Sequence, residues 1–343
     1  MERVCRLKQH LTNGSVVQYV LPEGAGILSS TQIKSYEENG YIVIKGVFTA
    51  SELNAYRNRF SEICNGARRD PGMLVMKDVL LARDGSEQVR INSPDGNVTK
   101  IQNIQDDEVL FSFCKHPKLL KYVRAFCGDS IRSIHTMLIN KPPDLGKGTS
   151  RHPMHQDLYY FPLAPAERIV GAWVAIDKVT RNNGCLAVIP GSHKKALLEH
   201  GYPEWKGGVN FGYHGVVEDL DIDARVYVEM DPGDCVLFHP LLIHGSGRNT
   251  TNGFRKAISC HYASGSLCSF APMPMNFMNE SFARLKIPPQ LLPQDLKLKL
   301  VQERWKLVSR QVAGTPSEEW TLDSSLTNKV TEAVSKATVA NKK

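Results

Sequence analysis

A histidine and an aspartate separated by one residue are the first feature of this sequence that could bind a metal ion. His155 and Asp157 flank Gln156, and in an extended segment residues two apart project to the same face. His244 follows an apolar run and precedes Gly245, which lets the backbone approach a neighbouring group closely. Two imidazoles and one carboxylate on one face form the ligand set that holds non-haem Fe(II) and leaves positions open for a co-substrate and O₂. The sequence therefore predicts an iron site at His155, Asp157 and His244.

An arginine follows the third ligand at a distance that suits an oxygenase using a keto acid. Arg255 lies eleven residues after His244, on the next expected strand. Its guanidinium can form paired hydrogen bonds with the distal carboxylate of a keto acid whose other end chelates the metal. A His-x-Asp pair by itself is more often an exposed polar pair than a metal site. The added histidine and arginine favour a keto-acid-dependent oxygenase.

Most other histidines are not expected to bind the metal. His152 precedes a proline and has no carboxylate two residues further on, and His239 lies five residues before His244, so that the two would face opposite sides of one strand. Five more are expected at the surface or in loops: His10, His116, His193, His200 and His214. A mononuclear zinc hydrolase is also disfavoured, because no general base accompanies the three candidate ligands.

The elements that must position these residues begin with a helical region. Gly40 can end a first helix, and Thr49 with Glu52 matches a capping box that opens a second one. The expected elements are a helix over 29–39, a strand over 41–44, a helix after 49, a strand within 73–81 and a helix near 106–127.

Short runs of β-branched and aromatic residues, separated by Gly, Pro and Asn, follow one another in the next part of the chain. No helical pattern lies between them, as is typical of antiparallel sheets. The expected strands are 133–140, 171–176, 185–189, 225–230, 235–238 and 257–263. The sequence thus predicts a mainly β fold with flanking helices, whose core is a double-sheet barrel of the jelly-roll type.

The chain is expected to form one large domain between a leader and a tail. The expected parts are a leader over 1–28, a single domain over 29–312 and a polar, frayed tail over 313–343. Within the domain, the expected divisions are a helical part over 29–130, a β core over 131–263 and a less regular part over 264–312, with an amphipathic helix around 293–312.

Composition and charge disfavour several other classes of protein. The chain has 343 residues, of which 42% are hydrophobic and 22% charged, as in ordinary globular domains. It has neither an apolar run that could cross a membrane nor a secretory signal, so a soluble intracellular protein is expected. The net charge is +7, but no basic block indicates nucleic-acid binding. The eight cysteines include no Cys-x-x-Cys pair and are expected to be reduced thiols.

Longer segments around these residues resemble the phytanoyl-CoA dioxygenase family. The similar segments are YEENGYIVIK at 36–45, HTMLINKPP at 135–143, the residues around His155, RNNGCL at 181–186, PGSH at 190–193 and residues 238–261. Together they span roughly residues 30 to 263. The resemblance implies a double-stranded β-helix in which His155, Asp157 and His244 hold the iron.

The resemblance also implies which residues contact 2-oxoglutarate. Arg255 and Ser246 would bind its carboxylate. The further residues that the family's pattern assigns to this site are Lys100, Met137, Gln156 and Trp173. Plain core packing is an equal explanation for Met137 and Trp173, and a solvated surface position is an alternative for Lys100.

The activity implied by the resemblance is hydroxylation at C2 of a 3-methyl-branched fatty acyl-CoA, as in fatty acid α-oxidation, with Fe(II), 2-oxoglutarate, O₂ and ascorbate as reductant. Retention of Asp157 argues against the related halogenases, in which a small residue stands at this position. The alternatives are an oxygenase of the same fold acting on another small molecule or free acid, and a catalytically silent jelly-roll binding protein. The sequence after Ser264 departs from the family's pattern and leaves the acyl-chain preference open.

The first residues resemble a targeting signal for import into the peroxisome. Residues 3–11, RVCRLKQHL, match the N-terminal nonapeptide signal, with a basic and an aliphatic residue, a gap of five, then His and Leu. The resemblance thus implies a peroxisomal import receptor as a partner and a peroxisomal location, with the cytoplasm as the alternative.

Overall fold

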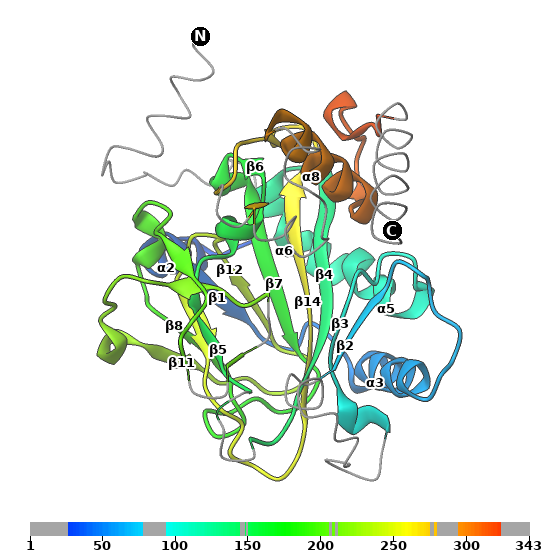
Figure 1. Ribbon diagram of the computed structural model, residues 1–343, viewed down its shortest axis with the longest axis vertical. Helices are drawn as coiled ribbons and strands as arrows, with labels where there is room; N and C mark the ends of the chain where they lie inside the picture. The colour runs from blue at the N-terminus through cyan, green and yellow to red at the C-terminus, as the bar shows by residue number, and fades with distance from the viewer. Residues whose placement is uncertain are drawn as a thin grey trace, which may run out of the picture.

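The computed structural model describes residues 27–77, 94–144, 148, 150–205, 208–209, 212–274, 278–279 and 294–323 (Figure 1). The targeting signal predicted at 3–11 lies outside these residues. Among the described helices, none combines the length and the apolar composition needed to cross a membrane.

A large antiparallel sheet forms one wall of the molecule. Its strands follow the spatial order β1 (Tyr41–Ile44), β12 (Cys235–Phe238), β7 (Ile169–Ala175), β14 (Arg255–Ser264), β4 (Ile131–Lys141), β3 (Val98–Gln102) and β2 (Leu74–Lys77), and β16 (Arg310–Ala313) also pairs with β4. The long strands β7, β14 and β4 run side by side through its centre (Figure 1).

A second, shorter antiparallel sheet carries most of the candidate metal site. Its order is β11 (Val226–Val228), β8 (Leu186–Val188), β13 (His244–Ser246) and β5 (His152–His155). Two further pairs join β9 (His200–Gly201) to β10 (Gly215–Val216) and β6 (Leu163–Ala164) to β15 (Ser269–Phe270). The large and the small sheet together form the predicted double-stranded β-helix, and the mainly β fold class is confirmed.

Helices accompany the sheets, as expected for a mainly β fold with flanking helices. The α-helices among the described residues are α2 (Ser30–Asn39), α3 (Ala50–Cys64), α5 (Glu108–Ser112), α6 (Pro117–Cys127) and α8 (Gln294–Val308). The short 3-10 turns are η1 (Pro94–Asn97), η2 (Phe113–Lys115), η3 (Asp157–Tyr160), η4 (Ala166–Arg168), η5 (Ser192–Lys194), η6 (Ile222–Ala224) and η8 (Glu318–Trp320). Both predicted helix starts are confirmed by capping boxes, at Ser29 with Gln32 and at Thr49 with Glu52.

The large sheet packs differently on its two faces because side chains alternate along each strand. Ile258, Cys260 and Tyr262 of β14 belong to one apolar cluster with residues of α3 and α6. Ala257 belongs to a second cluster, which includes residues of the small sheet. The space between the sheets is therefore lined by every second residue of the long strands, and Arg255, Ser259 and His261 face it.

Two predicted helices differ from those observed. The helix expected near 106–127 is divided into α5 and α6, because His116 precedes Pro117 and takes an extended conformation with ψ of 122°. The helix expected to reach residue 312 ends at Val308, and the strand β16 follows. β16 can pair with β4 because β3 occupies only residues 137–139 of that strand, which leaves residues 131–133 free to pair.

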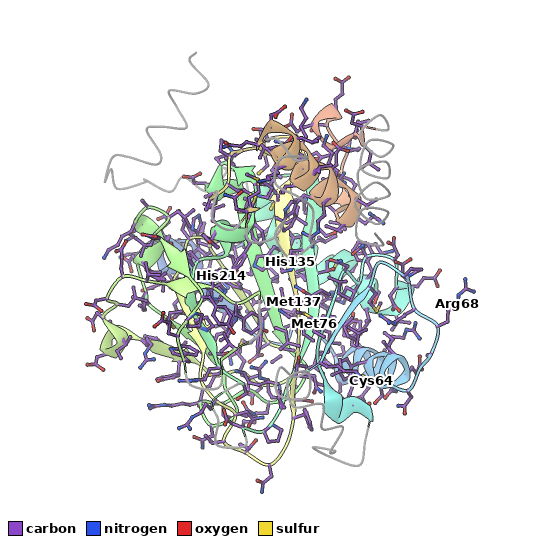
Figure 2. The ribbon with its side chains drawn as sticks, in the orientation of Figure 1. Cys64, Arg68, Met76, His135, Met137 and His214 are labelled. Carbon is purple, nitrogen blue, oxygen red and sulfur yellow. The ribbon has the colours of Figure 1, made fainter. Side chains whose placement is uncertain are left out.

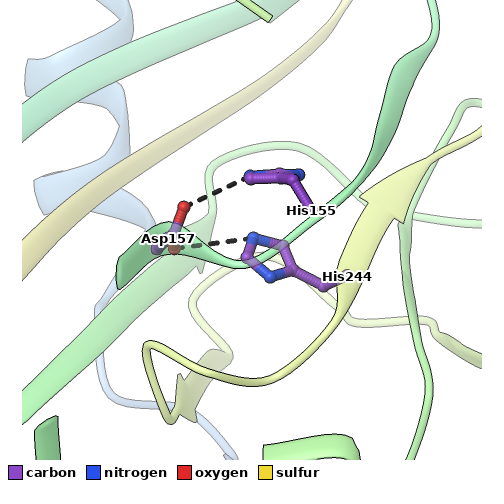
Figure 3. Close-up of side chains that lie close together, drawn as sticks. All are labelled: His155, Asp157 and His244. Carbon is purple, nitrogen blue, oxygen red and sulfur yellow. Dashed lines mark ion pairs between the residues drawn. The ribbon is translucent and has the colours of Figure 1, made fainter. Parts of the chain in front are cut away.

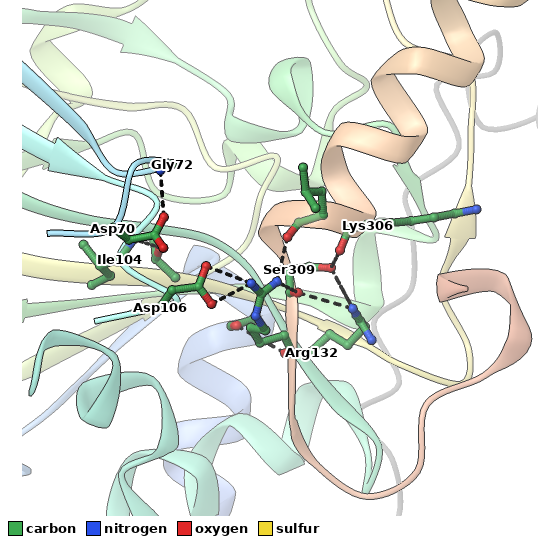
Figure 4. Close-up of polar contacts among 11 residues, drawn as sticks. Asp70, Gly72, Ile104, Asp106, Arg132, Lys306 and Ser309 are labelled. Atoms are coloured by element: carbon green, nitrogen blue, oxygen red, sulfur yellow. Dashed lines mark hydrogen bonds and ion pairs between the residues drawn. The ribbon is translucent and has the colours of Figure 1, made fainter. Parts of the chain in front are cut away.

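The polar tail predicted from residue 313 is wrong for its first part, because residues up to 323 pack on the domain. Trp320 is only 5% exposed, and the guanidinium of Arg132 lies 4.6 Å from the centre of its ring. Arg132 also donates to the Ser309 hydroxyl at 2.9 Å, and Arg310 forms two hydrogen bonds with the Asp106 carboxylate (Figure 4). These contacts fix the C-terminal part of the domain to the large sheet.

Candidate metal centre

The three residues with the chemistry of an iron ligand set lie together at the small sheet. His155 ends β5 and pairs directly with His244, the first residue of β13, so their imidazole rings lie 4.3 Å apart. The carboxylate oxygens of Asp157 lie 3.2 Å from Nε2 of His155 and 3.5 Å from Nε2 of His244 (Figure 3). One ligand atom from each residue lies within 4.8 Å of the other two.

The backbone fixes the orientation of both imidazoles. Nδ1 of His155 lies 2.9 Å from the carbonyl oxygen of Pro153, and Nδ1 of His244 lies 2.9 Å from that of Leu242. If each Nδ1–H donates to its carbonyl, each Nε2 keeps a lone pair that points toward the centre of the triad. Burial lowers the pKa of His244 to about 4, so this imidazole is neutral at neutral pH.

The carboxylate of the triad is held in its ionised form. Burial would raise the pKa of Asp157, but the nearby His244 and His261 and two hydrogen bonds outweigh burial, and this pKa lies well below its ordinary value. An ionised carboxylate beside the neutral imidazole of His244 fits a divalent cation, since such ligands must be deprotonated.

A third histidine, which the sequence pattern did not indicate, orients the carboxylate. Nε2 of His261 lies 2.7 Å from Oδ2 of Asp157, and the His261 ring stacks on that of His135 at 5.6 Å. Nε2 of His135 in turn lies 2.9 Å from the amide nitrogen of Gln102. Figure 2 shows His135 on β4 near Met137. Strand periodicity would have revealed His261, because it lies six residues after Arg255 on the same face of β14.

A cavity of about 110 Å³ adjoins the triad between the sheets. It is lined by His155, Asp157, His244, Lys77, Thr99, Lys100, Met137, Ile139, Lys141, Pro142, Ser150, His152, Trp173, Leu186, Tyr213, Phe238, Ser246, Arg255, Ser259 and His261. Its cations outnumber its single carboxylate, so an anionic ligand suits it.

Arg255 lies at one end of this cavity with most of its hydrogen-bonding capacity free. The side chain is 2% exposed, and Nη2 donates to the carbonyl oxygen of Gly184 at 2.6 Å. Within the described part of the chain, the buried Nε and Nη1 have no hydrogen-bond partner, and the indole of Trp173 lies 5.1 Å away. Burial lowers the pKa of Arg255 to about 10, so it stays charged at neutral pH. A buried guanidinium with two unpaired nitrogens is unfavourable until an anion binds it, so this end of the cavity fits a carboxylate.

Four of the five other residues expected to contact the co-substrate line the cavity: Met137, Trp173, Ser246 and Lys100. Lys100 is only 7% exposed, so the alternative of a solvated surface lysine is wrong.

Gln156 does not line the cavity, and its expected contact with the co-substrate is replaced by a different role. Its amide nitrogen donates to the carbonyl oxygens of Leu241 at 2.9 Å and Ala196 at 3.2 Å. Its amide oxygen accepts from the backbone of Leu198 at 2.8 Å. Alternation along the chain turns this side chain away from the side shared by His155 and Asp157, and Gln156 holds two loops behind the ligands.

Three histidines expected at the surface or in loops are buried. His193, His200 and His214 are at most 5% exposed. His200 accepts from the backbone N–H of Gln156 at 2.9 Å, and burial lowers its pKa to about 4. His152 lies outside the triad, and its ring lies 4.2 Å from that of His155.

Known proteins resemble this chain in sequence and in fold. The family model described as phytanoyl-CoA dioxygenase matches residues 36–257. The peroxisomal phytanoyl-CoA dioxygenase of Rattus norvegicus is 53% identical over 251 residues, which cover 72% of this chain and 71% of the rat protein. The probable phytanoyl-CoA dioxygenase of Caenorhabditis elegans is 52% identical over 260 residues, or 74% and 81% of the two chains. The peroxisomal enzyme of Homo sapiens is 50% identical over 250 residues, or 72% and 71%.

Solved structures share the fold at lower sequence identity. EctD from S. alaskensis, solved with 2-oxoglutarate and 5-hydroxyectoine, superposes with a TM-score of 0.54 at 20% identity and covers 75% of this chain and 82% of its own. The epimerase SnoN, solved with Fe³⁺, alpha ketoglutarate and nogalamycin RO, has a TM-score of 0.54 at 21% identity and covers 72% and 87%.

Proposed function

The chain belongs to the phytanoyl-CoA dioxygenase family, and from this premise we propose that it hydroxylates phytanoyl-CoA, a 3-methyl-branched fatty acyl-CoA, at C2. This reaction would be a step of fatty acid α-oxidation and would depend on Fe(II) and 2-oxoglutarate. The observation that carries the proposal is one cavity that joins a complete His, Asp, His ligand set to a buried arginine with two unpaired nitrogens.

The metal would be held by His155, Asp157 and His244, a ligand set that suits a divalent cation. When bound, Fe(II) would supply the O₂ activation that no side chain can provide. The contribution of the protein is to direct Nε2 of both imidazoles at the metal and to keep the carboxylate ionised and oriented by His261.

The distal carboxylate of 2-oxoglutarate would bind at the Arg255 end of the cavity. Nε and Nη1 of Arg255 are free to donate charge-assisted hydrogen bonds. The Ser246 hydroxyl lies in the same cavity, and Trp173 packs beside the guanidinium. Met137 and Lys100 would line the remaining length of the co-substrate, and Gln156 would act at a distance by fixing the loops behind the ligands.

A turnover assay tests this function. The protein, Fe(II), 2-oxoglutarate, O₂ and ascorbate as the reductant are incubated with phytanoyl-CoA, with unbranched acyl-CoAs and with free phytanic acid. The expected products are 2-hydroxyphytanoyl-CoA, succinate and CO₂ in equal amounts, because one atom of O₂ enters the acyl-CoA and the other enters succinate, while CO₂ is released from the C1 carboxylate of the keto acid. If another acid is hydroxylated at a higher kcat/KM than phytanoyl-CoA, the substrate assignment fails while the oxygenase class stands.

We also propose that the protein is peroxisomal. The mammalian relatives described above carry that location in their names, and residues 3–11 match an N-terminal import signal. Deleting residues 1–12 should leave the activity intact but disperse a tagged protein into the cytosol. Continued import of the truncated protein would refute the role of this segment.

A further inference from the structure

A buried lysine, Lys141, lies beside Arg255 and is not one of the residues expected to contact the metal or the co-substrate. Lys141 is the last residue of β4 and is 5% exposed. Its ammonium donates to the Ser246 hydroxyl at 2.8 Å, to the carbonyl oxygen of Gly247 at 2.8 Å and to that of Ser150 at 2.5 Å. Among the described residues, no carboxylate forms an ion pair with it. All three N–H groups are thus used on uncharged acceptors.

The register of the large sheet makes Lys141 and Arg255 direct neighbours. The two residues face each other across the β4–β14 ladder, and both side chains line the cavity. Gly184 joins them: its carbonyl oxygen accepts from Arg255, and a Cβ atom at this glycine would lie 2.7 Å from Cδ of Lys141. The stem of Lys141 is therefore closely packed on the loop that also holds Arg255.

We propose that Lys141 is a positioning residue for the co-substrate: it fixes the Ser246 hydroxyl so that its hydrogen points at the distal carboxylate, and it selects a keto acid with a second carboxylate. This inference rests on 2-oxoglutarate being the co-substrate. It assigns to Lys141 no direct contact with the ligand, because its three N–H groups are already donated.

The orientation of the Ser246 hydroxyl depends on the charge of Lys141. A lysine ammonium has three donors and no acceptor, so the Ser246 oxygen must accept from it, and the serine hydrogen is left for another partner. A neutral lysine amine has a lone pair and can take that hydrogen. The charged form of Lys141 therefore makes Ser246 a donor toward an anion in the cavity.

The charge of Lys141 beside that of Arg255 favours the binding of an anion at this end of the cavity. Burial and the charge of Arg255 lower the pKa of Lys141, while Asp144 and Cys185 oppose that shift only in part. His152, on β5, also faces this group and has a lowered pKa itself. Two adjacent buried cations are unfavourable alone, and a bound carboxylate would stabilise both. A keto acid that ends in a methyl group would leave them uncompensated.

Binding measurements on the Mn(II)-loaded protein test the inference without turnover. Calorimetric titration compares 2-oxoglutarate with 2-oxopentanoate, which has the same chain length but ends in a methyl group. Lys141→Met keeps the stem and removes the charge, and it should raise the Kd for 2-oxoglutarate about 10- to 100-fold. The Kd for 2-oxopentanoate should change less than about 3-fold. The thermal midpoint of each variant is recorded in parallel.

A double-mutant comparison tests whether Lys141 acts through Ser246. Ser246→Ala should weaken 2-oxoglutarate binding by a similar factor. In the double variant, the Kd for 2-oxoglutarate should rise by less than the product of the two single-variant factors. Lys256→Met is the matched control, because Lys256 follows Arg255 in sequence but its ammonium lies 5.5 Å from the Phe60 ring, among the helix-side residues. This control should leave both Kd values unchanged.

The pH dependence gives a further readout that a purely structural role would not change. At higher pH Lys141 loses its proton in the free protein and must regain it when the dianion binds, so the Kd of the wild-type protein for 2-oxoglutarate should rise with pH. Lys141→Met should lose this slope.

Three results would overturn the inference. The first is that Lys141→Met weakens the binding of 2-oxoglutarate and of 2-oxopentanoate equally, which would make the lysine a structural support. The second is full additivity of the two substitutions, and the third is an unchanged pH slope. If Lys141→Met does not fold, Lys141→Gln answers the same questions. A wild-type protein that fails to bind 2-oxoglutarate would instead refute the proposed function.

Discussion

The two faces of strand β14 show how one stretch of chain serves binding on one side and stability on the other. On the helix side, Ile258, Cys260 and Tyr262 are completely buried in the largest apolar cluster. On the cavity side, Arg255 and His261 are nearly as inaccessible to bulk solvent, yet within the described part of the chain Nε and Nη1 of Arg255 and Nδ1 of His261 have no partner. The helix-side residues pack on one another, whereas Nε and Nη1 of Arg255 are left for a ligand. Substitutions on the two faces should therefore have opposite consequences.

The largest effect is expected where the metal binds. His155→Ala, Asp157→Ala and His244→Ala should each reduce 2-oxoglutarate turnover by more than about 1,000-fold, because a triad without one ligand binds iron poorly. The metal-free variants should still fold, but Asp157→Ala should lower the thermal midpoint, because it leaves His261 without its ionised partner. Succinate release and thermal unfolding measure the two effects. Normal turnover in any variant would remove that residue from the site.

On the helix side of β14, the expected effect is on stability. Ile258→Ala should lower the free energy of unfolding by about 2–5 kcal/mol, because the side chain is fully buried and its removal leaves a cavity. The KM for 2-oxoglutarate should remain near that of the wild type. Denaturant unfolding measures the free energy of unfolding, and steady-state kinetics measure the KM for 2-oxoglutarate. A large rise in KM with normal stability would show that the two faces are not separate in function.

Arg255 should affect the co-substrate and leave the metal alone. Arg255→Ala should raise the KM for 2-oxoglutarate at least about 100-fold, because charge-assisted hydrogen bonds to the distal carboxylate are lost. Arg255→Lys should recover only part of the loss, since an ammonium lacks the planar fork. Turnover with pyruvate, which has no distal carboxylate, should change little. Loss of iron comparable to that of His244→Ala would instead make Arg255 a support of the metal site.

A smaller effect is expected at His261, which contacts the carboxylate and not the metal. His261→Phe removes the hydrogen bond to Oδ2 of Asp157 and should weaken metal binding about 10- to 100-fold. His261→Gln can still donate to that oxygen and should restore part of the affinity. Titration of the metal-free protein with Mn(II) measures both. Equal affinity of the Phe variant and the wild type would contradict the positioning role.

The last effect is on the pH dependence of folding and is confined to acidic pH. Burial lowers the pKa of His239 to about 3 and that of His200 to about 4, both below the value of about 6.5 for an unfolded histidine. The unfolded chain therefore binds more protons below pH of about 6.5, and the stability of the folded state decreases as the pH falls toward the folded values. Each such histidine contributes about 1.4 kcal/mol per pH unit in that window. His239→Gln should flatten the curve of unfolding free energy against pH between about 6 and 4, and an unchanged slope would exclude His239 as a contributor.

Local pattern alone predicted a considerable part of this molecule. The spacing of His155, Asp157, His244 and Arg255 indicated the metal ligands and the cation beyond them, because residues two apart on an extended chain share a face. The strand at 235–238 was predicted with its observed limits, and the capping box at Thr49 and Glu52 was correct. These features depend on neighbours within a few residues, and so the sequence contains all the information that they need.

The remaining features were decided by contacts between distant segments. His261 meets Asp157 across 104 residues of chain, and Lys141 lies beside Arg255 only through the register of two strands 114 residues apart in sequence. β16 pairs with β4 because β3 stops short and leaves part of that strand's edge free. Gln156 follows a metal ligand in sequence, but alternation turns its amide away from the cavity. The sequence by itself determined which groups could bind the metal and the keto acid, whereas strand register decided which buried groups orient them, because register is fixed only when the whole sheet assembles.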